Sequence, residues 1–243
     1  MRGTQLPGVD LSVWPKAVVL LLRNPSIVVV PLLMAVIGVA IQLTLPGGGV
    51  AGAATAGLGG LIIRLLMLFG LGTACIIADD AWRHGRASFD QGWIEARRRA
   101  GEIFFAAIGL TLLLAVASYA GLLFNAPVVS YILAAAVIFF CIWTIPAAAI
   151  GGVPGGAAIQ ISIDRVRANV LSAALSAITF VGLVVFAVPA LSLWLTGLML
   201  PYSGGSLIVI VLTGAVLDAI AIGYTALVIT KTYGDASFGG RRY

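Results

Sequence analysis

Long apolar runs separated by short polar segments dominate this chain. A membrane-spanning helix needs about 20 predominantly apolar residues, because its backbone groups must bond one another where no water is present. Six runs meet this requirement, at approximately residues 27–45, 58–78, 103–124, 128–150, 170–198 and 206–229. The pattern therefore predicts an all-α, polytopic bundle of six transmembrane helices, forming a single membrane domain over residues 1–243. Pro31, Pro146 and Pro189 lie inside these runs and predict kinks.

The basic residues alternate between successive connections. Four segments carry them: Arg2, Lys16 and Arg23; Arg83, Arg86, Arg97, Arg98 and Arg99; Arg165 and Arg167; Lys231, Arg241 and Arg242. The intervening connections, 46–57, 125–127 and 199–205, contain no Lys or Arg. Because Lys and Arg of short loops stay on the cytoplasmic side, we expect a multi-pass protein of a bacterial inner membrane with both termini in the cytoplasm.

Three segments that mix apolar and basic residues each precede a membrane run. In residues 11–23 the apolar side chains fall on one stripe of a helix that would lie in the membrane interface. Ser88 and Gln91 fit a capping box that would begin a second helix. Residues 159–167 fit a third helix or a strand, because apolar residues also alternate there.

Each of these segments ends in an arginine-containing triplet directly before a run: Arg23-Asn24-Pro25, Arg99-Ala100-Gly101 and Arg167-Ala168-Asn169. The correspondence predicts three repeats of an interfacial segment followed by a helical hairpin, a type of internal repeat that is common in transport folds. The orientation rule alone also produces basic segments at these places, so both explanations stay open.

Composition supports the membrane interpretation and excludes others. Apolar residues make up 61% of the chain and charged residues 9%, whereas soluble domains carry about 25% charged residues. The net charge of +5 is confined to short clusters between apolar runs, which argues against a nucleic-acid partner. Cys75 and Cys141 lie inside apolar runs and predict buried thiols.

Several short motifs resemble those of a known family. They are the entry segment ending in Arg23-Asn24-Pro25, the sequence Gly85-Arg86-Ala87-Ser88-Phe89 leading to residues 96–99, Ile145-Pro146-Ala147-Ala148, and residues 164–169. Together they resemble the membrane-domain family attached to some bacterial glycerophosphodiester phosphodiesterases, with its stand-alone, uncharacterised relatives, and the similarity extends over most of the chain. The resemblance implies a six-helix bundle. That family's hydrolase chemistry lies in a separate soluble domain, so no catalytic residue is carried over.

Two charged residues, Arg64 and Asp218, lie inside the apolar runs. A charge within a bilayer costs at least about 2.5–3.5 kcal/mol, so such residues face the protein interior and have partners. The two side chains could form a functional pair that lines a polar pathway or binds an anionic or protonatable ligand. Alternatively, the pair is structural, or Arg64 extends along its own helix to the interface.

The remaining polar residues suggest a binding face and no catalytic centre. We expect Arg83, Arg86, Arg97, Arg98, Arg99, Arg165 and Arg167 to form a cytoplasmic basic face for anionic lipid headgroups or a partner protein. The nearby carboxylates lack the His or Cys spacing of a metal site, and the single histidine, His84, lies at the membrane boundary. A haem held by two histidines, or a pigment held by an intramembrane imidazole, is therefore hard to build from this chain alone, and we expect no metal and no cofactor.

No nucleotide-binding, nucleophile-elbow, paired-cysteine or zinc-helix motif occurs in the sequence. We therefore expect a non-enzymatic accessory, scaffold or assembly subunit that packs against other membrane proteins or lipids. The alternative is a transport protein, either a small channel or a permease subunit that works with a separate ATPase. A water-accessible path past Asp218, or a coupling surface near residues 97–99 or 164–167, would distinguish the two.

Overall fold

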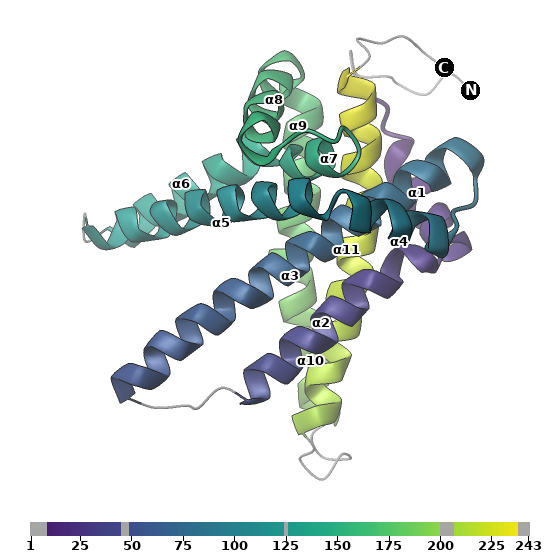
Figure 1. The fold of residues 1–243 in the computed structure, drawn as a ribbon. Coiled ribbons are helices and arrows are strands. Elements are labelled where there is room, and N and C mark those ends of the chain that lie inside the picture. The colour runs from purple at the N-terminus through teal and green to yellow at the C-terminus, as the bar shows by residue number, and fades with distance from the viewer. Residues whose placement is uncertain (1–8, 45–48, 124–125, 200–206, 238–243) are drawn as a thin grey trace.

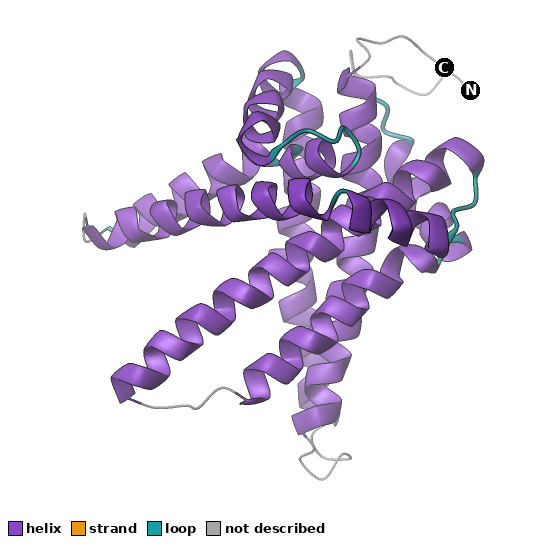
Figure 2. Cartoon of the chain, in the orientation of Figure 1, coloured by secondary structure: helices purple, strands orange, loops and turns teal. Residues whose placement is uncertain are grey.

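The computed structural model describes residues 9–44, 49–123, 126–199 and 207–237. Helices make up nearly all of this part of the chain, and it contains no β-strand (Figure 2). The all-α prediction is confirmed. The predicted far-side connections overlap residues 45–48, 124–125 and 200–206, and Arg2, Arg241 and Arg242 lie in the terminal segments; these positions are outside the described residues.

Six helical stretches within the described residues are long and apolar enough to cross a membrane, as predicted. The first three are α2 (Ser26–Thr44), α3 (Gly49–His84) and α5 (Ala100–Leu123). The fourth combines α6 (Pro127–Cys141) with α7 (Thr144–Ala149). The fifth joins α9 (Val170–Phe180), a π-helical segment η1 (Val181–Ala187) and α10 (Val188–Met199), and the sixth is α11 (Leu207–Ser237).

The spans form three hairpins that diverge from a shared base (Figure 1). Helices α2 and α3, α5 and α6, and α10 and α11 point in different directions away from this base. Half or more of the residues in the apolar windows of α3 and α11 are buried, against a third or fewer in each other span. Helices α3 and α11 are therefore the centre of the fold, and the other spans present mainly apolar surface outward.

Three short helices occupy the base, where the sequence predicts interfacial segments. They are α1 (Val13–Arg23), α4 (Phe89–Arg98) and α8 (Gly155–Ala168), and each leads into a span. The segment for which a strand also fitted is thus a helix. Ser88 is the N-cap of α4 as predicted, but its hydroxyl makes no capping bond; its backbone N–H donates instead to Asp80, at 3.3 Å. The threefold repeat stays a prediction, which this order of helices supports.

Two predicted kinks coincide with changes in helix geometry. Proline lacks the N–H that bonds the carbonyl four residues earlier. Pro146 therefore cannot donate to the carbonyl of Ile142, and the helix is interrupted at that point between α6 and α7. Pro189 is the second residue of α10, two positions after the end of η1, where the helix widens to π geometry. Pro31 lies within α2, which continues through it.

The core lies at the base, where the three hairpins converge. Trp143 is fully buried there, and its indole N–H donates to the hydroxyl of Thr232 on α11 at 3.1 Å. The same hydroxyl lies 3.0 Å from that of Ser176 on α9. Ser162 on α8 accepts the backbone N–H of Trp143 and donates to the carbonyl of Phe140, so it occupies the helix break. Four elements are thus joined through one buried polar network.

Candidate functional site

Arg64 and Asp218 do not meet. Arg64 is exposed on α3, and Asp218 is half-buried on α11. Within the part of the chain that the structure describes, five ion pairs form, and neither residue belongs to any of them. Both charges thus lie within apolar spans, and they do not form the predicted pair with each other.

The paths of α3 and α11 explain this separation. The two helices meet near the base, where the Thr230 hydroxyl donates to the carbonyl of Cys75 at 3.4 Å, and they diverge from there (Figure 1). Arg64 lies eleven residues before Cys75, or about 17 Å along its helix. Asp218 lies twelve residues before Thr230, or about 18 Å. The two charges therefore lie at similar heights on separate helices.

The basic face is a set of arginines with different surroundings. Arg83 pairs with Asp79 at 2.9 Å, and Arg98 with Glu95 at 3.8 Å, both as exposed arginines one helical turn from their partners. Such surface pairs contribute about 0–1 kcal/mol. Arg86, Arg97 and Arg167 are exposed and form no ion pair with a described residue. These three remain available to an external anion.

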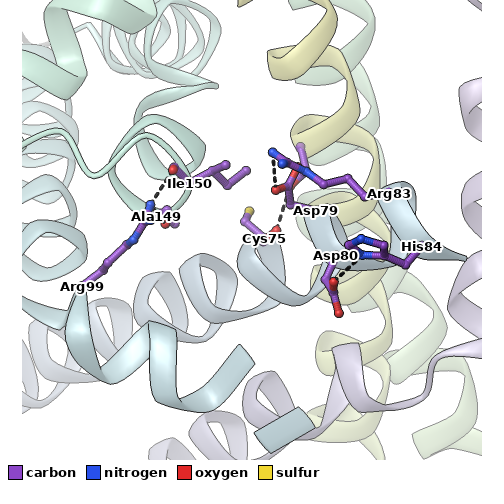
Figure 3. Close-up of polar contacts among 9 residues, drawn as sticks. Cys75, Asp79, Asp80, Arg83, His84, Arg99, Ala149 and Ile150 are labelled. Atoms are coloured by element: carbon purple, nitrogen blue, oxygen red, sulfur yellow. Dashed lines mark hydrogen bonds and ion pairs between the residues drawn. The ribbon is translucent and has the colours of Figure 1, made fainter. Parts of the chain in front are cut away.

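Arg99 has a structural role, although the sequence pattern predicted that it would bind lipid headgroups or a partner protein. Its guanidinium pairs with Glu95. It also donates to the carbonyls of Ala149, at 3.0 Å, and Ile150 (Figure 3). These carbonyls end α7, where the last turn of a helix has no internal partners and carries partial negative charge. Arg99 therefore holds the end of the fourth span against α4.

Arg165 is likewise engaged within the fold. Its guanidinium carbon lies 3.9 Å from the centre of the Tyr233 ring, a cation–π contact between α8 and α11. One of its terminal nitrogens is buried without a hydrogen-bond partner. Of the predicted basic face, Arg99 and Arg165 thus join helices, while the exposed arginines remain open to binding.

Asn24 connects two turns of the base, a role for which the sequence gives only the motif Arg23-Asn24-Pro25 as a signal. Its buried carboxamide donates to the carbonyls of Leu20, at 2.9 Å, and Gly85, at 3.4 Å, and accepts the N–H of Ala87 at 2.9 Å. Asn24 therefore connects the break between α1 and α2 to the turn after α3 through hydrogen bonds. Arg99 and Arg165 make corresponding connections to the ends of α7 and α11.

His84 and three acidic residues of this face, Asp79, Asp80 and Glu95, are paired locally. His84 Nδ1 lies 2.7 Å from an oxygen of Asp80, one turn earlier on α3 (Figure 3). Among the described residues no three His, Cys, Asp or Glu side chains come together as a metal site would require. Cys75 and Cys141 are buried free thiols, as predicted.

The fold and its surface define a six-helix integral membrane protein. Comparison of the chain with protein-family models, with curated proteins and with solved structures gives no match. The resemblance to the membrane domains of glycerophosphodiester phosphodiesterases therefore stays a prediction.

Proposed function

We propose that this protein is a non-enzymatic assembly subunit of a bacterial inner membrane, and that its diverging hairpins receive helices of other membrane proteins. The observation that carries the proposal is the separation of Arg64 and Asp218 within apolar spans, without an ion pair among the described residues. An unpaired charge inside a membrane costs several kcal/mol unless a partner or water compensates it. Partner helices that carry polar or oppositely charged residues would supply that compensation.

The surface of the spans supports the same proposal. Large apolar side chains are exposed on the second hairpin, among them Phe105, Leu112, Val116 and Ile132. In a membrane this surface faces lipid or another protein. Arg64 on α3 and Asp218 on α11 belong to two different hairpins, which diverge away from the base (Figure 1).

Isolation of the full chain from native membrane in a mild detergent tests the proposal. We expect partner proteins in fixed ratio, and we expect Asp218→Asn or Arg64→Gln to reduce their recovery severalfold. Matched controls are Asp235→Asn on α11 and Arg83→Gln on α3, which remove equal charges from ion pairs near the C-terminal ends of the same two helices. Neither control should alter recovery.

The stability of the purified chain separates this proposal from an internal pair. Removing a charge that has no partner among the described residues should leave the unfolding temperature of the isolated protein unchanged or raise it. If each single variant lowered that temperature and the double variant restored it, Arg64 and Asp218 would pair internally and the proposal would fail. An ATP-hydrolysing partner recovered in fixed ratio would instead identify a transport protein.

A further inference from the structure

A cavity of about 540 Å³ opens on the basic face between the α1–α2 break and the turn after α3. It is lined by Arg23, Asn24, Pro25, Ser26, Gly85, Arg86 and Ala87. The cavity thus brings together two arginines that lie 63 positions apart in the sequence. Both are exposed, and neither forms an ion pair with a described residue.

The walls of this cavity are held in place by Asn24. Its carboxamide connects the wall that carries Arg23 to Gly85 and Ala87, which flank Arg86. Gly85 adopts φ +75°, a conformation that suits glycine and allows the tight turn. The positions of the two arginine backbones are therefore fixed before any ligand arrives.

The electrostatics of the cavity favour an anion. The guanidinium groups of Arg23 and Arg86 can each bind a phosphate through two parallel hydrogen bonds. Ser26 begins α2, a helix of 19 residues, so the partial positive charge of that helix end adds to the two arginines. Of the carboxylates on the preceding turn, Asp79 is paired with Arg83, and Asp80 contacts the His84 ring and accepts the backbone N–H of Ser88.

The surroundings favour a phosphate that is attached to lipid. Leu22 is 79% exposed beside Arg23, and Val29 and Leu33 are exposed on α2 just beyond the cavity. Arg23 precedes the first span and Arg86 follows the second, so the cavity lies at the height where a span meets the headgroups. Acyl chains could therefore lie along apolar surface while the phosphate contacts both arginines.

We propose that Arg23 and Arg86 form a binding site for the phosphodiester of an anionic phospholipid, with Asn24 as its positioning residue. The site does not depend on the proposed assembly role, because it uses only this chain and lipid. A phosphate of the membrane leaflet and a free phosphate share the same recognition chemistry. The test must therefore distinguish these two sources.

The test measures lipid bound to the purified, delipidated full chain in detergent, by native mass spectrometry and by its unfolding temperature. Phosphatidylglycerol, phosphatidylcholine, inorganic phosphate and glycerol phosphate are added separately. We expect phosphatidylglycerol to bind and to raise the unfolding temperature, with a much smaller effect of phosphatidylcholine. Protection by inorganic phosphate equal to that by phosphatidylglycerol would overturn the assignment to lipid.

The variant for this test is R23Q/R86Q, and the matched control is R97Q/R167Q. The control removes two exposed, unpaired arginines from the same face and lies outside the cavity. We expect the cavity variant to bind phosphatidylglycerol about tenfold more weakly than the control, because it also loses paired hydrogen bonds. Equal losses in both variants would show general attraction to the basic face and overturn the site.

A second variant, R23K/R86K, keeps the charge but removes the two-pronged geometry of each arginine. We expect its affinity to fall between those of the unmodified chain and R23Q/R86Q. Its fold should be intact, since both side chains are exposed. If R23K/R86K folds normally and R23Q/R86Q binds phosphatidylglycerol as tightly as the unmodified chain, the proposal fails.

Discussion

The indole of Trp143, in the break between α6 and α7, donates a 3.1 Å hydrogen bond to the hydroxyl of Thr232 on α11. Both side chains are buried, so this bond joins the fourth and sixth spans in the core. Replacing Trp143 with Phe removes the donor and leaves unfilled volume, and we expect a loss of about 2–3 kcal/mol in the free energy of unfolding.

Unfolding of the purified protein in mixed detergent micelles, followed by circular dichroism, measures that loss. The control is Trp194→Phe, because Trp194 is exposed on α10. We expect the control to unfold within experimental error of the unmodified protein. Equal stability of the two variants would mean that the contact between Trp143 and Thr232 contributes little to the fold.

Arg99 and Arg98 provide a comparison between neighbouring residues of the same charge. Both pair with Glu95, but only Arg99 also donates to the carbonyls that end α7. Arg99→Gln leaves these carbonyls without a charged donor, and we expect it to cost about 2 kcal/mol of stability. Arg98→Gln should cost less than about 0.5 kcal/mol.

Thermal unfolding of both variants checks this difference. Limited proteolysis gives a second measurement, since loss of the Arg99 contacts should expose the segment around Gly152 to cleavage. If Arg99→Gln and Arg98→Gln behaved alike, the role of Arg99 would be that of an ordinary surface charge, and it would return to the set of arginines available for binding.

The sequence predicted the elements of this fold more completely than their contacts. Apolar length identifies the six spans, and helical periodicity identifies α1, because both depend on residues that are local in the chain. The alternation of basic residues located α4 and α8 at the base, although apolar alternation in α8 also fitted a strand. These features require no knowledge of how the helices pack.

The candidate site was harder to predict because it depends on helix directions. The heights of Arg64 and Asp218 along their helices suggested a pair, but the divergence of α3 from α11 separates them. The cavity arises because Asn24 joins two turns that are distant in sequence, and no periodic pattern encodes that contact. The triplet Arg23-Asn24-Pro25 was the one local signal, and it marked the break correctly.

Two adjacent glycines at the start of α8 test how closely this helix approaches α5. A β-carbon added at Gly155 would lie 2.6 Å from the backbone carbon of Phe105, whereas one added at Gly156 meets no atom within 4 Å. Backbone cannot move aside as a flexible side chain can. We therefore expect Gly155→Ala to destabilise the protein by about 2 kcal/mol or to reduce its yield.

Gly156→Ala is the matched control, and it should be neutral or stabilising by up to about 1 kcal/mol, because alanine favours a helix. The two variants differ by one position and carry the same added methyl group. The yields of the two variants after membrane extraction and their unfolding temperatures show whether the methyl group added at Gly155 destabilises the protein. A Gly155→Ala variant as stable as Gly156→Ala would show that α8 does not pack against α5 in this way.

Membrane orientation gives the last prediction, because it decides which leaflet the basic face and the proposed lipid site contact. Arginines that flank spans resist transfer across the membrane, so α1, α4 and α8 should remain on the side of synthesis. We expect a reporter that fluoresces only in the cytoplasm to be active when fused after Tyr243, and a periplasmic phosphatase fused there to be inactive.

Cysteine labelling tests whether the opposite ends of the spans face the periplasm. A cysteine introduced between residues 46 and 57 should react with a membrane-impermeant reagent added to the outside of spheroplasts. The natural thiols Cys75 and Cys141 are buried and should not interfere. Activity of the phosphatase after Tyr243, together with failure to label residues 46–57 from outside, would reverse the orientation. The lipid site would then belong to the outer leaflet, and the partner helices would approach from the cytoplasmic half.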